Sequence, residues 1–294
     1  MTIKIVTDST SDLPETLIAQ HDITVVPAHI NIGDHSYLDG IELSREEFYE
    51  NLPHYDPLPQ TSTPGLGTFI RTYEQLADDG ATQILSIHIS AKLSGMMNVA
   101  HSAAQTTEAV PITVFDSRQL SLGTGFLVLT AARAAQEGYS MQEIVGLLEQ
   151  QTQRTYSFAL LDTLEFLRRG GRLSRFQSGV GALLRIKPLL IVNNGEMTMQ
   201  RVRTRTRARE RLIGLVSDLI PLEQLALIHA HAPDAVEELR QQVQHLVPKG
   251  TQDGLITAEV TPAIGTHVGP GAVGLVCVKS PQGAEVHRRK ERVS

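Results

Sequence analysis

The chain has 294 residues, of which 41% are hydrophobic, and a formal net charge of −6. This length is typical of two domains, and the negative charge argues against a general binder of nucleic acid or of membrane surfaces. No apolar run approaches the roughly 20 residues of a membrane span. The single cysteine, Cys277, cannot form an internal disulfide and lies in an apolar run. We therefore expect a cytoplasmic protein without stable membrane insertion, in which Cys277 is a core residue.

The first half of the chain alternates strand-like and helix-like segments. Two of the helices begin with a capping-box signature, a serine followed three residues later by glutamate, at Ser44 and Ser140. Repeated strand–helix units predict a parallel sheet with helices on both faces. The expected strands cover residues 3–9, 23–32, 82–90 and 112–117, and the expected helices begin at residues 11, 44, 63, 94, 125 and 140.

The second half has a different pattern, which predicts an α+β fold with a mixed or antiparallel sheet. A β-hairpin is expected over residues 187–204, because Asn194-Gly195 favours a tight turn between two strands. A basic helix should follow at 205–220. We place the boundary between the halves near residues 152–155, which gives domains at 1–153 and 154–294. Further strands are expected at residues 156–161, 222–231, 254–262 and 271–280, and a further helix at 235–247.

Hydroxyl-rich segments follow several expected strands of the first half. In an open parallel sheet, ligands bind outside the carboxyl ends of the strands. Thr61, Ser62 and Ser94 would supply hydroxyl groups there, and Gly95 or Met96 a backbone N–H. None of these groups is a good base, so the set favours holding an anion over activating a nucleophile. The simpler interpretation of Ser94 is an N-cap at the start of a helix.

A serine hydrolase or acyltransferase using Ser94 is the alternative enzyme hypothesis. Ser94 lacks the G-x-S-x-G elbow, His88 lies on the preceding strand, and His101 follows two helical turns later. No histidine or cysteine spacing resembles a zinc site, so no metal is expected. His267, in the glycine-rich segment 265–274, is either part of a structural loop or a group that contacts a bound anion.

Basic residues concentrate in the second half. Between Arg168 and Arg211 lie 12 of the 26 lysines and arginines, against two acidic residues. Arg201, Arg203 and Arg205 alternate, so on a strand they would share one face. Such clusters suit phosphate or an acidic protein surface. An RNA-binding module is the third hypothesis, although no RNA-binding motif accompanies the charge and we expect no nucleic-acid partner.

The motifs, taken together and in order, resemble the DegV family of bacterial fatty-acid-binding proteins from Val6 to about Leu275. This resemblance implies two α/β domains with a lipid held between and within them. Residues 1–153 would bind the lipid, and residues 154–294 would contribute to its enclosure and to partner docking. The segments that carry the resemblance are VTDSTSDLP, YLDG, PQTSTPGLGTF, SAKLSGMMNVAHSA, VFDSRQLSLGTG, DTLEFLRRGGRLS, IKPLLIV, RVRTRTRARERL and GTHVGPGAVGL.

The resemblance also implies a ligand and its contacts. The carboxylate of a long-chain fatty acid would meet Thr61 and Ser94, with His267 close by. The acyl chain would occupy an apolar tunnel, for which the candidate residues are Leu93, Met96 and Met97. Both methionines stand where the family often has other residue types, and their adaptable side chains could reshape the tunnel.

A partner is implied as well. In family members that serve as fatty acid kinase subunits, a separate ATP-dependent kinase phosphorylates the bound fatty acid. The phosphate-facing or partner-facing residues would be Arg172, Arg203 and Arg205. The chain itself would have no catalytic residue and no cofactor, only the fatty acid as ligand.

Overall fold

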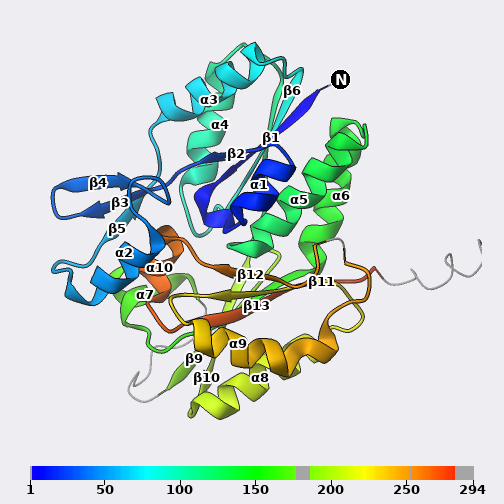
Figure 1. The fold of residues 1–294 in the computed structure, drawn as a ribbon. Coiled ribbons are helices and arrows are strands. Elements are labelled where there is room, and N and C mark those ends of the chain that lie inside the picture. Colours follow the sequence, from blue (N-terminus) through cyan, green and yellow to red (C-terminus); the bar gives the residue numbers. More distant parts are fainter. Residues whose placement is uncertain (1, 177–185, 252, 282–294) are drawn as a thin grey trace, which may run out of the picture.

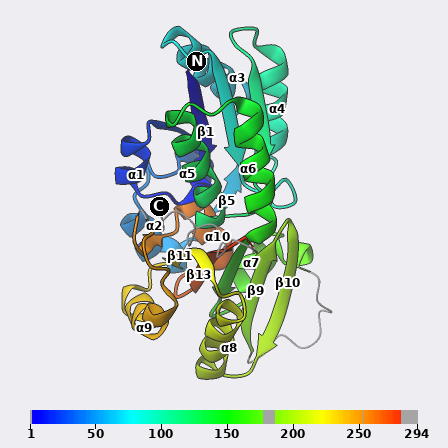
Figure 2. The same ribbon diagram turned by 90° about the vertical axis from the view of Figure 1, so that its right-hand side faces the viewer.

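The computed structural model describes residues 2–176, 186–251 and 253–281. Four strands of the first half form a parallel sheet in the order β2-β1-β6-β7. Helices α1 and α5 lie on one face of this sheet and α3 and α4 on the other (Figures 1 and 2). The predicted parallel α/β layer is therefore confirmed. The strands are β1 (Ile3–Asp8), β2 (Ile23–Val26), β6 (Gln83–His88) and β7 (Ile112–Asp116), and the helices are α1 (Glu15–Gln20), α3 (Leu66–Asp78), α4 (Met96–Thr106), α5 (Leu122–Gln136) and α6 (Met141–Arg154).

Six strands of the second half form a mixed sheet in the order β10-β9-β8-β13-β11-β12. Only the pair β11–β12 is parallel among these strands, and the other four pairings are antiparallel. Helices α8 and α9 cover the lower face of this sheet in Figure 1. The elements are β8 (Thr155–Leu160), β9 (Lys187–Asn193), β10 (Glu196–Val202), α8 (Arg205–Ser217), β11 (Leu222–His229), α9 (Pro233–Val243), β12 (Ile256–Glu259) and β13 (Val273–Lys279).

The predicted hairpin is confirmed, but its second strand is shorter than expected. Asn194 and Gly195 both have positive φ, as the tight turn requires. Strand β10 ends at Val202, because the Thr204 hydroxyl accepts a hydrogen bond from the backbone N–H of Arg207 and begins α8. Arg201, Arg203 and Arg205 therefore do not share one strand face.

A small third sheet was not predicted. The expected strand over 23–32 is broken at Pro27, which has no N–H to donate to a strand ladder. Beyond it, β3 (His29–Ile32) pairs antiparallel with β4 (His35–Leu38) and β5 (Gln60–Ser62). Thr61 and Ser62 consequently lie on an antiparallel strand, outside the parallel sheet.

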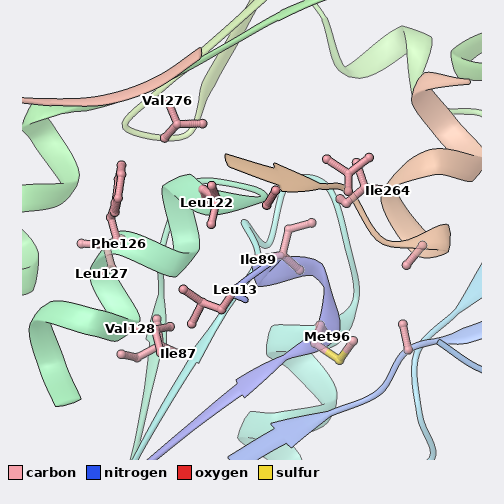
Figure 3. Close-up of a cluster of buried hydrophobic side chains, with 14 of the residues drawn as sticks. Leu13, Ile87, Ile89, Met96, Leu122, Phe126, Leu127, Val128, Ile264 and Val276 are labelled. Atoms are coloured by element: carbon pink, nitrogen blue, oxygen red, sulfur yellow. The ribbon is translucent and has the colours of Figure 1, made fainter. Parts of the chain in front are cut away.

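Helix α5 lies between the two large sheets and joins their cores. Of its 15 residues 11 are buried, which is the pattern of a helix surrounded by protein. Figure 3 shows Leu122 and Phe126 of α5 in the same cluster as Val276 of β13. A second apolar cluster lies between the mixed sheet and helices α8 and α9, and it contains the buried Cys277. Burial raises the pKa of the Cys277 thiol to about 12.

Short helix α10 (Pro262–Val268) belongs to the second half but is held by side chains of the first. Asp12 accepts hydrogen bonds from the backbone N–H of Thr261 at 2.8 Å and from Ser121 Oγ at 2.5 Å. Asp39 accepts hydrogen bonds from the N–H of Ala263 at 3.2 Å and from Ser9 Oγ at 2.6 Å. Both carboxyl groups are buried.

Burial raises the pKa of Asp12 to about 7 and that of Asp39 to about 6. Hydrogen bonds and the charge of Arg45 on helix α2 (Arg45–Asn51) oppose this shift only in part. Since the folded carboxyl of Asp12 binds its proton more tightly than the unfolded one, it contributes stability that is lost as the pH rises toward 7.

We predict that Asp12→Asn flattens this dependence. The amide has the same shape, carries no charge, and can accept from Thr261 and donate to Ser121. Between pH 5 and pH 8 the free energy of unfolding of the wild type should fall by about 2–3 kcal/mol more than that of the variant. Urea denaturation across this pH range measures the difference. Parallel curves for the two proteins would mean that Asp12 is ionised throughout the range.

Candidate functional site

A cavity of about 380 Å³ lies between the carboxyl end of the parallel sheet, strand β5, and elements of the second half. Both halves of the chain therefore build its wall, which is mostly apolar. Its apolar side chains are Ala28, Ile89, Leu93, Met96, Leu120, Leu167, Phe176, Leu190, Ala263, Ile264 and Val268. The remaining lining residues are Thr10, Thr61, Ser62, Thr63, Ser94, Gly95, Arg172 and His267.

Thr61 and His267 meet in this cavity. The pairing of β5 with β3 fixes Thr61 opposite Ile30, and α10 carries His267 in its last turn. Thr61 Oγ1 lies 2.8 Å from His267 Nε2. Burial lowers the pKa of His267 to about 4, and the nearby charge of Arg172 contributes, so the imidazole is neutral at physiological pH.

The surroundings of His267 favour one tautomer. A neutral imidazole has one N–H and one acceptor nitrogen. Nδ1 is buried and has no hydrogen-bond partner among the described residues, and a buried N–H without an acceptor is costly. The proton therefore belongs on Nε2, which donates to Thr61 Oγ1. The Thr61 hydroxyl hydrogen is then free to point at a ligand.

Ser94 presents a second hydroxyl. Its Oγ accepts a hydrogen bond from the backbone N–H of Met96 at 3.2 Å, so its own hydrogen is also available for a ligand. Helix α4 begins at Met96, one residue after its N-cap Gly95, and its positive end favours a negative charge here. A Cβ on Gly95 would lie 3.7 Å from Cγ2 of Thr63, which places the start of α4 beside the end of β5.

Arg172 adds a charge to the cavity wall. Its side chain is half-buried, and Nη1 donates to the carbonyl of Gly170 at 2.7 Å. Burial and the neighbouring Arg175 lower the pKa of its guanidinium, which nevertheless stays charged at neutral pH. Two hydroxyl donors, a helix start and a guanidinium along an apolar wall are suited to an amphiphilic anion.

The cavity contains most of the residues that the sequence indicated. Thr61, Ser62, Ser94, Gly95 and His267 line it together, and so do Leu93, Met96 and Arg172. Three candidates are not among the lining residues. Met97 follows Met96 on α4 and points elsewhere, and Arg203 and Arg205 are exposed near the start of α8.

The apolar lining from the second half was not predicted. Leu167 of helix α7 (Glu165–Arg169), Phe176 and Leu190 come from separate elements, and Ile264 comes from α10. Each looks like an ordinary core residue in the sequence, and no local pattern tells which core residues face a cavity. Thr10, in the 3₁₀ turn η1 (Ser9–Ser11), was also missed, although it lies in the segment VTDSTSDLP that carries the family resemblance.

The histidines closest to Ser94 in sequence do not activate it. His88 is fully buried, with Nδ1 2.9 Å from Asp8 Oδ2 and Nε2 2.7 Å from Ser86 Oγ. Ser86 is itself buried and contacts Tyr73 Oη at 2.9 Å, so this triad-like chain has no access for a substrate. His101 is exposed on α4. Ser94 thus lacks a base from either residue.

Within residues 2–176, 186–251 and 253–281, no group of three or more His, Cys, Asp or Glu side chains could hold a metal ion. His229 and His231 share one acidic neighbour, Glu259, with nitrogen–oxygen distances of 4.0 and 3.5 Å, and His229 Nδ1 also accepts a hydrogen bond from the backbone N–H of Ala232. None of the helices described for this chain has both the length and the apolar character needed to cross a bilayer.

Comparison with known proteins identifies the family. A family described as "Uncharacterised protein, DegV family" matches residues 2–280. The chain belongs to the DegV family. It is 36% identical over 278 residues to the DegV domain-containing protein SCO2569 of Streptomyces coelicolor, an alignment that covers 93% of this chain and 97% of that protein.

Solved DegV structures share the fold. A DegV family protein from Thermus thermophilus, described as fatty acid binding, is 33% identical and superposes with a TM-score of 0.86 over 95% of this chain and 100% of that one. DegV of Bacillus subtilis, described as a fatty acid binding protein, is 30% identical, with a TM-score of 0.84 and the same coverage. The mixed α/β architecture of this chain is therefore that of its family.

We predict that Gly170→Ala displaces His267. A Cβ at position 170 would stand 2.3 Å from His267 Nδ1 and 3.0 Å from the carbonyl oxygen of Phe166. The backbone of Gly170 is in the right-handed helical region, so only this collision opposes alanine. We expect a loss of about 1–3 kcal/mol in the free energy of unfolding, measured by urea denaturation, and a crystal structure with the imidazole away from Thr61.

The matched control is Gly146→Ala on α6. A Cβ there meets nothing within 4 Å, so this variant should gain roughly 0.5–1 kcal/mol through helix propensity. If Gly170→Ala is as stable as the wild type and keeps the Thr61–His267 contact, the steric argument is wrong.

Proposed function

We propose that this protein binds a long-chain fatty acid in the cavity. The observation that carries the proposal is the combination, in one cavity, of the hydroxyl groups of Thr61 and Ser94 with a mostly apolar wall. The carboxylate would accept hydrogen bonds from both hydroxyls, near the N-terminus of α4 and the guanidinium of Arg172. The acyl chain would contact Leu93, Met96 and the apolar residues of the second half.

The expected binding energies support different roles for the apolar wall and the polar groups. Each buried CH₂ contributes roughly 0.8 kcal/mol, so a 16-carbon chain provides on the order of 10 kcal/mol before the costs of ordering and association. The polar groups then fix the orientation of the ligand more than its affinity. Fatty acid binding by the DegV proteins of Thermus thermophilus and Bacillus subtilis supports the proposal.

The two halves of the chain would have different roles. Residues 1–153 would hold the head group through Thr61 and Ser94, and residues 154–294 would enclose the acyl chain and dock a partner. The passage from α6 to β8, between Arg154 and Thr155, supports a boundary at this point.

We further propose that a separate ATP-dependent kinase acts on the bound fatty acid. A carboxylate oxygen would attack the γ-phosphorus of ATP, ADP would leave, and the acyl phosphate would stay in the cavity. Arg172 borders the cavity and can face the transferred phosphate, whereas Arg203 and Arg205 are exposed and can contact the kinase. In this scheme the protein supplies the substrate and no catalytic residue.

We predict that Ser94→Ala weakens palmitate binding about tenfold, the factor expected for one lost hydrogen bond to a carboxylate. Displacement of a fluorescent fatty acid measures the affinity, and mass spectrometry of extracts from the purified wild type identifies any co-purified lipid. Ser102→Ala, an exposed change on the same helix, is the control and should bind like the wild type. Unchanged affinity in Ser94→Ala would remove Ser94 from the site, and a wild type that binds no fatty acid would refute the function.

The kinase proposal predicts a separation of two activities. Replacing Arg203 and Arg205 together by alanine should leave palmitate affinity within twofold of the wild type, because neither residue lines the cavity. Acyl phosphate formation with a DegV-dependent kinase and ATP should fall at least tenfold. Arg71→Ala, which removes one exposed positive charge on α3, is the control for loss of surface charge at a distance in sequence from the proposed docking residues and should leave turnover unchanged. Normal turnover in the double variant would rule out these arginines as the docking residues.

A further inference from the structure

Helix α10 supplies a large part of the cavity wall. Ala263, Ile264, His267 and Val268 all line the cavity, yet the helix is only seven residues long. Its N-cap residue, Thr261, makes no capping hydrogen bond with its own side chain. The position of α10 therefore depends on groups from other elements that satisfy its first N–H groups.

Those groups all come from the first half of the chain. Asp12 accepts from the N–H of Thr261, and Asp39 accepts from the N–H of Ala263. Tyr49 Oη donates to the carbonyl of Val260 at 3.1 Å. A Cβ on Gly265 would come within 2.4 Å of Tyr49 Oη, so the tyrosine ring packs directly on the backbone of α10. We call Asp12, Asp39 and Tyr49 the α10 clamp.

The two carboxylates of the clamp are fixed in turn. Ser121, which precedes α5, donates to Asp12, and Ser9 donates to Asp39. Ser9 Oγ also accepts from the N–H of Ala28, so Asp39 is tied to the strand segment leading to β3. Strand β3 in turn pairs with β5, which carries Thr61. The same framework thus holds the start of α10 and the partner of His267.

The distance from the clamp to the site is short. Ala263, which Asp39 holds, is four residues before His267, and four residues of α-helix rise about 6 Å. A single helical turn is too short to bend independently, so a shift at Ala263 moves the imidazole by a similar amount. Hydrogen bonds weaken steeply with distance and angle, so the 2.8 Å contact between His267 Nε2 and Thr61 depends on this placement.

We propose that Asp12 and Asp39 are positioning residues for carboxylate recognition. By fixing the start of α10 they keep His267 in contact with Thr61, and this contact leaves the Thr61 hydroxyl hydrogen free for the ligand. This inference rests on the proposed function, because it concerns the same head-group contacts. It assigns a role to Asp12 in the segment TDSTSD and to Asp39 in the segment YLDG. Neither aspartate lines the cavity, so the lining residues alone do not explain them.

The test compares two ligands with the same acyl chain, palmitate and hexadecanol. The ratio of their dissociation constants measures head-group recognition, and contributions of the apolar wall cancel. In Asp39→Ala the preference for palmitate should fall about tenfold, the factor for one hydrogen bond to a charged group. Asp39→Asn, which can accept from Ala263 and donate to Ser9, should restore most of the preference. Asp39→Ser is the second variant if the alanine protein does not fold.

A double-mutant cycle separates positioning from general destabilisation. If the clamp acts through the Thr61–His267 contact, Asp39→Ala should change the palmitate preference less than twofold once Thr61 is replaced by valine. Leu212→Ala opens a hole in the second apolar cluster, to which neither α10 nor the cavity lining belongs, so it should lower stability and leave the preference unchanged.

The outcomes distinguish the two levels of the hypothesis. A wild type that binds neither ligand, or binds both equally, refutes the proposed head-group site and this inference with it. If the wild type prefers palmitate but the Asp39 variants bind palmitate and hexadecanol more weakly by the same factor, the ratio of the two dissociation constants does not change and the clamp is merely structural. Additive effects of Asp39→Ala and Thr61→Val on the ratio would likewise overturn the inference and leave the function intact.

Discussion

The hydrogen bond between Thr61 and His267 is the contact on which the candidate site depends. It joins residues 206 positions apart in sequence and closes the cavity between a strand of the first half and a helix of the second. Burial keeps the imidazole neutral, and within residues 2–176, 186–251 and 253–281 nothing accepts a hydrogen bond from Nδ1, which places the proton on Nε2. A charged histidine would attract an anion more strongly, but the neutral form costs less to bury and leaves the Thr61 hydroxyl hydrogen for the ligand.

The framework that maintains this contact is a shared core. Helix α5 packs against both large sheets, so the two halves bury one continuous apolar cluster (Figure 3). Buried carboxylates then orient α10, a short helix whose N-cap residue makes no capping hydrogen bond with its own side chain. Apolar burial stabilises the fold but is non-directional, so it does not fix the orientation of α10. The hydrogen bonds to Asp12 and Asp39 fix that orientation, and burying the two carboxyl groups costs desolvation energy. The candidate site depends on both contributions.

Much of this arrangement could be predicted from the sequence, and the failures have physical causes. Strand–helix alternation and the Asn194-Gly195 turn are local signals, and both predictions are confirmed. The capping box is complete at Ser140, whereas at Ser44 only the serine half is formed. Pro27 breaks the strand that was predicted to be continuous over 23–32, whereas the helix predicted from residue 205 is confirmed, with Thr204 as its N-cap. Phe176 and Leu190 could not be assigned to the cavity, because only the tertiary fold selects which apolar residues face it.

The buried state of Cys277 has a practical consequence for experiments on this chain. The thiolate is the reactive form of cysteine, and a thiol pKa of about 12 in a closed apolar cluster suppresses it. Since the chain has no other cysteine, a new one introduced on an exposed residue would be the single reactive thiol in the native protein. Fluorophores or spin labels can then be attached in pairs across the two halves, by way of two such exposed positions, without first removing a native cysteine.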